Sequence, residues 1–317
     1  MVLAFICQAH SQIIFVKQDA TGNGTSWSDA TGDLAKALHQ ATAGTQIWVA
    51  TGTYKPTAGN DRKVSFEIKD GVQVFGGFQG TESTVETRNI AANPTILTGE
   101  IGQPGKGDNS YNVVYIKKAS AGTLLDGLTI AAGNANSDAA EGERTRCGGG
   151  LFIDGKGGDS KPVIRNCTFT GNLGRDGAAV YINGRSGKCS PVFDKCHFNN
   201  NEAGLDGGAV YNDGRLNGLS NPIFTDCTFE RNMGTYGGAI CNASENGNCN
   251  LTLENCTFKE NAAYLRGGAV FSLNGIEKCY LDMTDCNFTG NYPDDQNMIF
   301  TSNTARSEAY KITKAEP

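Results

Sequence analysis

The chain has 317 residues, of which 42 are glycine and 8 are proline, and its formal net charge is −6. This acidic balance argues against a nucleic-acid partner, because proteins that bind nucleic acid usually carry a basic excess. No apolar run approaches the roughly 20 residues that a membrane-spanning helix needs, so we expect no transmembrane segment.

The first residues resemble the end of a secretory signal peptide. The apolar stretch VLAFIC precedes the small-x-small triplet AHS, a pattern typical of signal cleavage. No basic residues precede this stretch, so in this interpretation the start is either truncated or mis-assigned, and the alternative is a short apolar N-terminal strand. We therefore expect residues 1–11 to be a signal peptide and residues 12–317 to form one exported domain, either secreted or held at the cell surface.

Residues 32–41 (GDLAKALHQA) are expected to form a short amphipathic helix. Asp33 is a suitable N-cap, and Leu34, Leu38 and Ala41 fall on one helical face. A helix at the start of a stacked β structure would cover apolar surface and strand edges that are otherwise exposed.

Short β-rich segments lie before and after this helix, separated by glycine and polar turns. They are residues 13–20, 46–54, 64–68, 72–78, 94–99, 112–116 and 124–130. We interpret residues 12–130 as degenerate coils of the repeat that follows. Residues 131–146 (AAGNANSDAAEGERTR) are interpreted as a polar, exposed insertion.

Five regular coils occupy residues 147–296, and residues 297–317 form the C-terminal end. Each coil contains the string Cys-x-Phe-x-x-Asn, and the successive cysteines are 29, 31, 29 and 30 residues apart. The strings begin at Cys167, Cys196, Cys227, Cys256 and Cys286. A fixed period of this length indicates a repeat architecture in which equivalent positions stack on one another.

The repeat also predicts the direction of its side chains. Cys and Phe are two residues apart, so both point to one face of a strand, which we expect to be the interior. The closing Asn should stack with its equivalents at a bend, as in asparagine ladders. Strands that follow strands with no helix between them cannot form βαβ units. We therefore predict an all-β fold, a single-stranded right-handed parallel β-helix with a short N-terminal capping helix.

The cysteines support the same interpretation. A small hydrophobe that recurs between buried positions suits the role of a free, buried thiol. A second column holds Cys249 and Cys279 one coil apart, and these two could form a disulfide if their Cβ atoms face each other. No Cys-x-x-Cys pattern of a zinc site is present.

Several strings resemble the repeats of polymorphic outer-membrane-protein-like β-helices. They are GGAVYN at 207–212, GGAICN at 237–242, NCTFTGN at 166–172 and NCTFKEN at 255–261. The N-terminal string VKQDATGNGTSWSDAT is similar to the opening coils of secreted β-helix proteins common in Bacteroidetes. The resemblance implies an exported member of the pectate-lyase-like superfamily, which includes polysaccharide lyases and glycoside hydrolases. Adhesin-like surface proteins are also among its members.

One column of side chains precedes the Gly-Gly strings and is the main candidate site. It contains Cys147, Asp176, Asp206, Tyr236 and Arg266. Stacked carboxylates repel, which raises a pKa or recruits a cation, so Asp176 and Asp206 are candidate calcium ligands. Tyr236 and Arg266 suit the proton transfer and charge neutralisation of β-elimination. Alternatively, each Asp simply stabilises its turn.

A second column contains the cations Lys156, Arg185 and Arg215. Cations on adjacent coils repel unless something anionic lies across them, so this column is a candidate binding site for an acidic polysaccharide. The alternative is that they are solvated turn residues. His197 should face solvent between Cys196 and Phe198, and it is a weaker candidate for a catalytic role.

A third column contains Phe152, Tyr181, Tyr211, Cys241 and Phe271. If it faced outward it would be a flat platform for sugar rings, and if it faced inward it would be core. We favour the core, because aromatic ladders commonly fill the interior of solenoids.

Three functions fit these patterns. The favoured one is a secreted lyase that cleaves an acidic, uronic-acid-containing and glycosaminoglycan-like polysaccharide by β-elimination. The second is a non-catalytic, adhesin-like protein that binds polysaccharide. The third is a glycoside hydrolase that uses Asp176 and Asp206 as a carboxylate pair about 5 Å apart.

Overall fold

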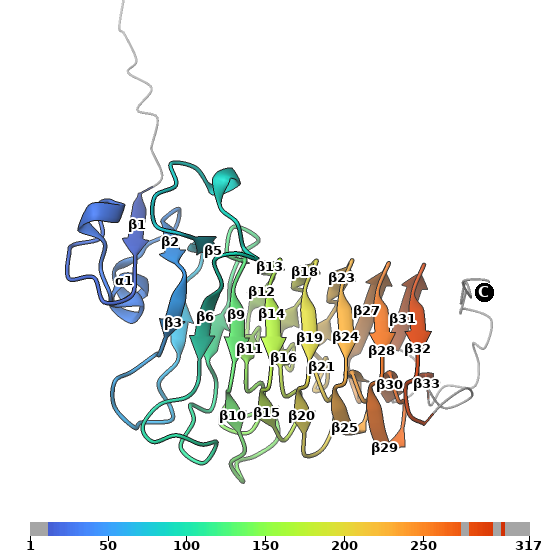
Figure 1. Cartoon of the computed structure of the whole chain (residues 1–317). Coiled ribbons are helices and arrows are strands. Elements are labelled where there is room, and N and C mark those ends of the chain that lie inside the picture. The colour runs from blue at the N-terminus through green and yellow to red at the C-terminus, as the bar shows by residue number, and fades with distance from the viewer. Residues whose placement is uncertain (1–11, 274–278, 294–298, 302–317) are drawn as a thin grey trace, which may run out of the picture.

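Parallel strands stack coil upon coil through the part of the chain that the computed structural model describes, residues 12–273, 279–293 and 299–301 (Figure 1). The fold is the predicted all-β, right-handed parallel β-helix with one short helix near its N-terminal end. The predicted signal peptide, residues 1–11, and most of the C-terminal end, residues 297–317, lie outside the described residues. None of the described helices is long and apolar enough to cross a membrane.

Sheets A and B form two faces of the β-helix. Sheet A consists of β1 (Ile13–Val16), β2 (Gln46–Ala50), β5 (Gln73–Phe78), β8 (Leu124–Asp126), β13 (Val163–Arg165), β18 (Val192–Asp194), β23 (Ile223–Thr225), β27 (Asn248–Glu254) and β31 (Cys279–Thr284), with β12 (Asp159–Ser160), β17 (Lys188–Cys189) and β22 (Leu219–Ser220) joined through β27. Sheet B consists of β3 (Gly52–Tyr54), β6 (Thr95–Thr98), β9 (Thr129–Ala131), β14 (Thr168–Thr170), β19 (His197–Asn199), β24 (Thr228–Glu230), β28 (Thr257–Lys259) and β32 (Asn287–Thr289).

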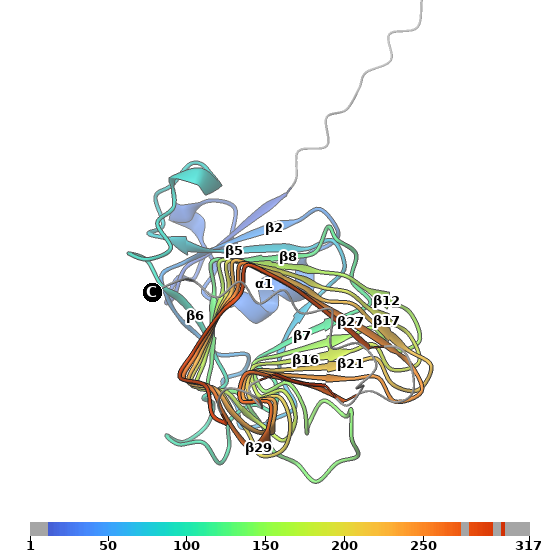
Figure 2. The same ribbon diagram turned by 90° about the vertical axis from the view of Figure 1, so that its right-hand side faces the viewer.

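Sheet C forms the third face, and the short sheet D lies outside it. Sheet C consists of β4 (Phe66–Ile68), β7 (Val114–Lys117), β11 (Leu151–Asp154), β16 (Val180–Asn183), β21 (Val210–Asp213), β26 (Ile240–Ala243), β30 (Val270–Leu273) and β33 (Ile299–Thr301). Sheet D consists of β10 (Asn134–Ala135), β15 (Leu173–Gly174), β20 (Glu202–Ala203), β25 (Met233–Tyr236) and β29 (Ala262–Arg266). Figure 2 shows sheets A, B and C around the interior, with β29 outside this outline.

The phenylalanines of the repeat fill the interior, as predicted. Phe169, Phe198, Phe229 and Phe258 are fully buried. Their rings stack nearly parallel, with centroids of successive rings 4.6 to 5.0 Å apart. In-register pairing of β14, β19, β24 and β28 sets this spacing, so the aromatic stack follows directly from the strand register.

The cysteines of the repeat lie beside this stack as free, buried thiols, which confirms their predicted role. The Cys196 thiol donates to the Ile164 carbonyl of the preceding coil at 3.5 Å. Burial raises the pKa of the Cys167 thiol to about 12. Pairing of β27 with β31 places Cys249 opposite Cys279, but the Cys279 side chain lies outside the described residues.

The closing asparagines form the predicted ladder. The side-chain oxygen of Asn201 accepts from the backbone and side-chain nitrogens of Asn172 at 3.1 and 3.0 Å. The same pattern links Asn201 to Asn232, Asn232 to Asn261, and Asn261 to Asn291. All five side chains are buried, so the ladder satisfies polar groups that water cannot reach.

The N-terminal helix also matches its prediction. It is α1 (Leu34–Gln40), and the Asp33 carboxylate accepts from the backbone nitrogen of Lys36 at 2.8 Å. The first strand ends at Val16, four residues earlier than expected, and the chain turns at Asp19 with φ 63°. Two 3₁₀ turns, η1 (Trp27–Asp29) and η2 (Val85–Thr87), lie in the connecting loops.

The prediction for residues 131–146 was wrong in one respect. Asn134 and Ala135 of this segment are buried in β10, which pairs with β15 as the first strand of sheet D. The insertion therefore begins as part of a coil. Only residues 136–146 form an irregular loop, and this loop is partly buried.

We expect Asn232→Ala to lower the free energy of unfolding by roughly 2–5 kcal/mol, because each buried polar group that loses its partner costs about 1–3 kcal/mol. The groups affected are the backbone nitrogen of Asn201 and the carbonyl of Phe198. Urea unfolding measures the loss. Asn287→Ala, at an exposed position of β32, is the control, and equal losses in both variants would contradict the role of the ladder.

Candidate functional site

The first predicted column exists in the structure. Parallel backbone β-bridges place Cys147 beside Asp176, Asp206 beside Tyr236, and Tyr236 beside Arg266. The Gly177 nitrogen donates to the Asp206 carbonyl at 2.8 Å and so joins the two halves of the column. The column runs along the edge of sheet D where each coil turns toward sheet C.

Exposure increases along this column. Cys147 and Asp176 are buried, with exposed fractions of 0% and 2%. Asp206 and Tyr236 are half-buried, and Arg266 is exposed. A large ligand arriving from solvent could therefore contact only the last three residues.

The two aspartates have different environments. The Asp176 carboxylate forms an ion pair with the Nε of Arg146 at 2.9 Å; burial raises the pKa of Asp176 and Arg146 opposes this rise. For Asp206, burial and then the charge of Asp176 raise the pKa to about 6. Asp206 is thus a carboxyl group that exchanges its proton near neutral pH.

The calcium prediction gains no support from this geometry. Among the described residues, no group of three or more His, Cys, Asp or Glu side chains is arranged to hold a metal ion. Asp176 is already paired with Arg146. Calcium binding by Asp176 and Asp206 stays a prediction.

The cations of the second column have partners within the chain. Arg215 donates from Nε and Nη2 to the two carboxylate oxygens of Asp213 at 2.9 and 2.7 Å. Arg185 donates from Nη1 to the Glu141 carbonyl at 2.8 Å and lies 3.7 Å from Asp213. Lys156 is exposed on its turn. The anions that offset the two arginines are the chain's own, and a role in substrate binding stays a prediction for all three cations.

Sequence reasoning missed three members of this cluster, namely Arg146, Glu141 and Asp213, and did not predict the contact of Tyr181 with Asp213. Asp213 is fully buried and accepts from the Tyr181 hydroxyl as well as from Arg215. The only signal for Asp213 was its place in the turn string DGR. Glu141 is 74 residues from Arg215 in the chain, so no local pattern could have paired them.

The aromatic column is buried, but on the outer face of sheet C. Phe152, Tyr181 and Tyr211 stack with successive centroids 5.2 and 5.3 Å apart. With Cys147 they form a cluster separate from the main core. The favoured prediction, an inward-facing column that fills the interior, was therefore wrong in direction: these side chains face outward from sheet C. They are nevertheless buried, in a second compartment outside sheet C.

His197 occupies the predicted outward position. It is exposed in β19 and pairs with Thr168 and Thr228 of the neighbouring strands. This position is on sheet B, whereas the first column lies at the edge of sheet D. The structure does not bring His197 into that column, and its catalytic role stays a prediction.

Exposed aromatic side chains on the last described coils were also missed. Tyr264 in β29 is 70% exposed, Tyr292 is 67% exposed, and Leu265 lies between Tyr264 and Arg266 in the chain. Tyr292 follows one coil later, where it pairs with Ala262 at the start of β29. The last described coils of sheet D therefore present aromatic rings and a guanidinium to solvent.

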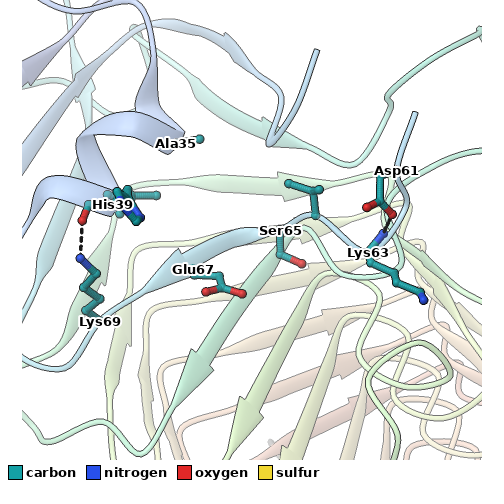
Figure 3. Close-up of a pocket in the computed structure, with 9 residues that line it drawn as sticks. Ala35, His39, Asp61, Lys63, Ser65, Glu67 and Lys69 are labelled. Carbon is teal, nitrogen blue, oxygen red and sulfur yellow. Dashed lines mark hydrogen bonds between the residues drawn. The ribbon is translucent and has the colours of Figure 1, made fainter. Parts of the chain in front are cut away.

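A separate cavity of about 340 Å³ lies between α1 and β4 (Figure 3). His39, Asp61, Ser65 and Glu67 contribute to its lining. Lys69 donates to the carbonyls of His39 and Ala41 at the end of α1. This cavity contains none of the predicted site residues. Its Lys69 links β4 to the end of α1 and so holds the capping helix in place.

The family follows from a comparison with family models. The model described as a right-handed β-helix region matches residues 69–312. The chain belongs to this right-handed β-helix family. No protein of curated function matches the chain.

Among solved structures, the pectate lyase Pel9A is similar to this right-handed β-helix at a TM-score of 0.57 and 13% identity. The match covers 91% of this chain and 66% of that enzyme, so the chain spans slightly less than two thirds of its length. A pectin methylesterase from Aspergillus niger has a TM-score of 0.47 and 13% identity, with 93% of this chain and 91% of that chain covered. At these identities the likeness shows the fold alone, since one fold hosts many activities.

We expect Asp206→Asn to stabilise the β-helix above pH 7 and to change stability little near pH 4. Folding raises the pKa of Asp206 from 3.8 to about 6, so the folded state holds the proton more tightly than the unfolded chain. The free energy of unfolding therefore falls as the pH rises from about 4 to about 6, because the folded state must give up a proton that it binds more tightly. The amide of Asp206→Asn does not titrate, so the variant should not show this fall.

Urea midpoints at the two pH values measure this effect. Asp282→Asn, an exposed carboxylate on sheet A, is the matched control. A pH-independent difference between wild type and Asp206→Asn would show that Asp206 does not titrate in this range.

Proposed function

We propose that the chain is an exported protein that binds an acidic, uronic-acid-containing polysaccharide of the glycosaminoglycan-like kind and cleaves it by β-elimination. The observation that carries the proposal is the row Asp206, Tyr236 and Arg266. These residues lie in register on consecutive coils, about 4.8 Å apart. One carboxyl, one phenol and one guanidinium thus line one edge of the molecule.

The chemistry of β-elimination assigns a role to each group. A uronate must have its carboxylate neutralised before its α-proton can be removed, and the planar guanidinium of Arg266 matches a carboxylate in geometry and charge. A base then takes the α-proton, the bond to the leaving oxygen breaks, and an acid protonates that oxygen. Tyr236 and Asp206 are the groups in this row that can hold or release a proton.

The exposed tyrosines supply a binding surface. Tyr264, two residues before Arg266 in β29, and Tyr292, which pairs with Ala262 at the start of β29, have most of their surface in water. Exposed aromatic groups of this kind mark interaction sites, and flat rings suit the apolar faces of sugars. A chain of uronate residues would gain both ring contacts and charge neutralisation at the last described coils.

The burial of Asp176 argues against the hydrolase alternative. A retaining hydrolase needs two carboxyl groups that both reach the glycosidic bond. Asp176 is only 2% exposed and is paired with Arg146, so a sugar ring cannot approach it. Binding without cleavage stays the second candidate function, because the exposed Tyr264 and Tyr292 would serve it equally well.

One experiment separates these functions. The protein is incubated with polygalacturonate, alginate, hyaluronan and chondroitin sulfate, and the ultraviolet absorbance of an unsaturated uronide product is followed. We expect absorbance to rise with at least one polymer. Binding without any rise would replace the lyase with a binding protein, and new reducing ends without unsaturated product would restore the hydrolase.

The row itself is tested by Tyr236→Phe and Arg266→Ala. We expect kcat/KM to fall by about 10²–10⁴-fold for the proton-transfer group and about 10²–10³-fold for the charge-neutralising group. Tyr280→Phe, at an exposed position of sheet A, and Lys259→Ala, whose half-exposed side chain on sheet B is paired with Glu230, are the controls away from this row. Full activity in both Tyr236→Phe and Arg266→Ala would remove this row from the site.

A further inference from the structure

Residues 136–146, hereafter the strap, follow β10 and lie on the outer side of sheet C (Figure 2). Their sequence, NSDAAEGERTR, contains no large apolar side chain. The strap therefore has no large apolar side chain of its own as an anchor, and its charged and polar side chains hold it on the β-helix.

The side-chain attachments of the strap are ion pairs and hydrogen bonds to several coils. They are Asn136 with Arg62 at 2.8 Å, Asp138 with Arg175 at 2.5 Å, Glu141 with Arg215 at 2.6 Å, Arg146 with Asp176 at 2.9 Å, and Arg144 with Ser65 at 2.8 Å, Asn112 at 3.3 Å and Glu67 at 3.7 Å. The Arg144 guanidinium also lies 4.0 Å from the ring centroid of Tyr115. Beneath it lie polar groups that are almost wholly buried, including Asp176 and Asp213. The strap thus covers a charged surface that would otherwise face solvent.

Glu141 binds two cations of the second column at once. Its carboxylate accepts from Arg215 Nη1 at 2.6 Å, and its carbonyl accepts from Arg185 Nη1 at 2.8 Å. Gly142, with φ 83°, lies so close to Arg185 that an added Cβ would stand 2.5 Å from Nη1. The Glu141–Gly142 turn is therefore fitted against both guanidinium groups.

The two anions on these arginines are not equivalent. Asp213 is fully buried, and Arg215 binds it through two nitrogens. The Glu141 side chain is 43% exposed, whereas the Arg215 side chain is 10% exposed, so solvent and solutes reach this ion pair from the Glu141 side. Arg185 and Arg215 carry two positive charges against the one negative charge of Asp213. Glu141 supplies the second negative charge, and it is the one that another carboxylate can replace.

We propose that Glu141 occupies the place of a ligand carboxylate. A uronate carboxylate of an acidic polysaccharide displaces Glu141 from Arg215 and Arg185, and the Glu141–Gly142 turn of the strap then moves away from these arginines while Arg146 stays paired with Asp176. This inference rests on the substrate class of the proposed function but not on cleavage. The displaced position lies in the same coils as Asp176 and Asp206, so one polymer could extend from there along the row to Arg266.

The test measures ligand affinity and strap exchange separately from turnover. Oligogalacturonate, oligoalginate and hyaluronan oligosaccharides are titrated by calorimetry, with fully methyl-esterified oligogalacturonate as the probe that lacks the carboxylate. Hydrogen exchange of a peptide spanning residues 138–146 reports strap opening. We expect an acidic oligosaccharide, but not the ester, to speed exchange in the wild type.

Three variants sharpen the test. Glu141→Gln should bind the acidic oligosaccharide about two- to fivefold more tightly, the size expected from removing one partly exposed ion pair, and its strap should exchange faster without ligand. Glu143→Gln changes an exposed carboxylate two residues away in the same strap and should do neither. Arg185→Gln should weaken binding, since it removes one of the two cations.

Equal affinity and equal strap exchange in wild type, Glu141→Gln and Glu143→Gln would overturn the inference. Failure of every acidic oligosaccharide to bind Glu141→Gln would overturn it as well. Acidic ligands that bind and loosen the strap without an unsaturated product would support it while refuting the lyase. Product formation with no change in strap exchange would support the lyase and refute the displacement of Glu141.

Discussion

Hydrogen bonds between equivalent residues of neighbouring coils determine where every side chain of the candidate site lies. Because β14, β19, β24 and β28 pair in register, their phenylalanines stack and their asparagines join in a ladder. In sheet D the register shifts between Gly234 and Tyr236, and this irregularity places Tyr236 opposite Arg266. A slip of one residue would turn each inward side chain outward. The buried side chains therefore fix the register and, with it, the positions of the surface side chains.

Sheet D and the strap give this solenoid a second layer of buried side chains. The aromatic column on the outer face of sheet C would be open to solvent in a plain three-sheet coil. Here it is covered, and the cover brings charged groups into contact with rings, as where Arg215 lies 5.4 Å from the ring centroid of Tyr211. Buried charges persist only when they are paired, which explains why Asp213 is bound by both Arg215 and Tyr181.

The sequence predicted the fold in detail, because periodicity is a property of the chain itself. The Cys-x-Phe-x-x-Asn string identified the interior and the ladder, and the alignment of coils identified the column from Cys147 to Arg266. The sequence could not show that Asp176 is buried behind Arg146, since that contact depends on how the irregular segment 136–146 folds against the coils. The contact of Glu141 with Arg215 was unpredictable for the same reason, because Glu141 lies in a loop whose path no repeat specifies. Tyr264 was missed because it interrupts the repeat and leaves no column to compare.

The asparagine ladder also limits how this molecule could change in length. Each side-chain oxygen accepts from the asparagine of the preceding coil, so the hydrogen bonds all run in one direction from Asn172 to Asn291. Adding or removing part of a coil would break this series of amide hydrogen bonds. Adding or removing a whole coil would keep it, because the asparagines of the flanking coils would again be neighbours. The β-helix is therefore modular in units of one coil, and duplication of a complete unit extends the surface that a long polymer can contact.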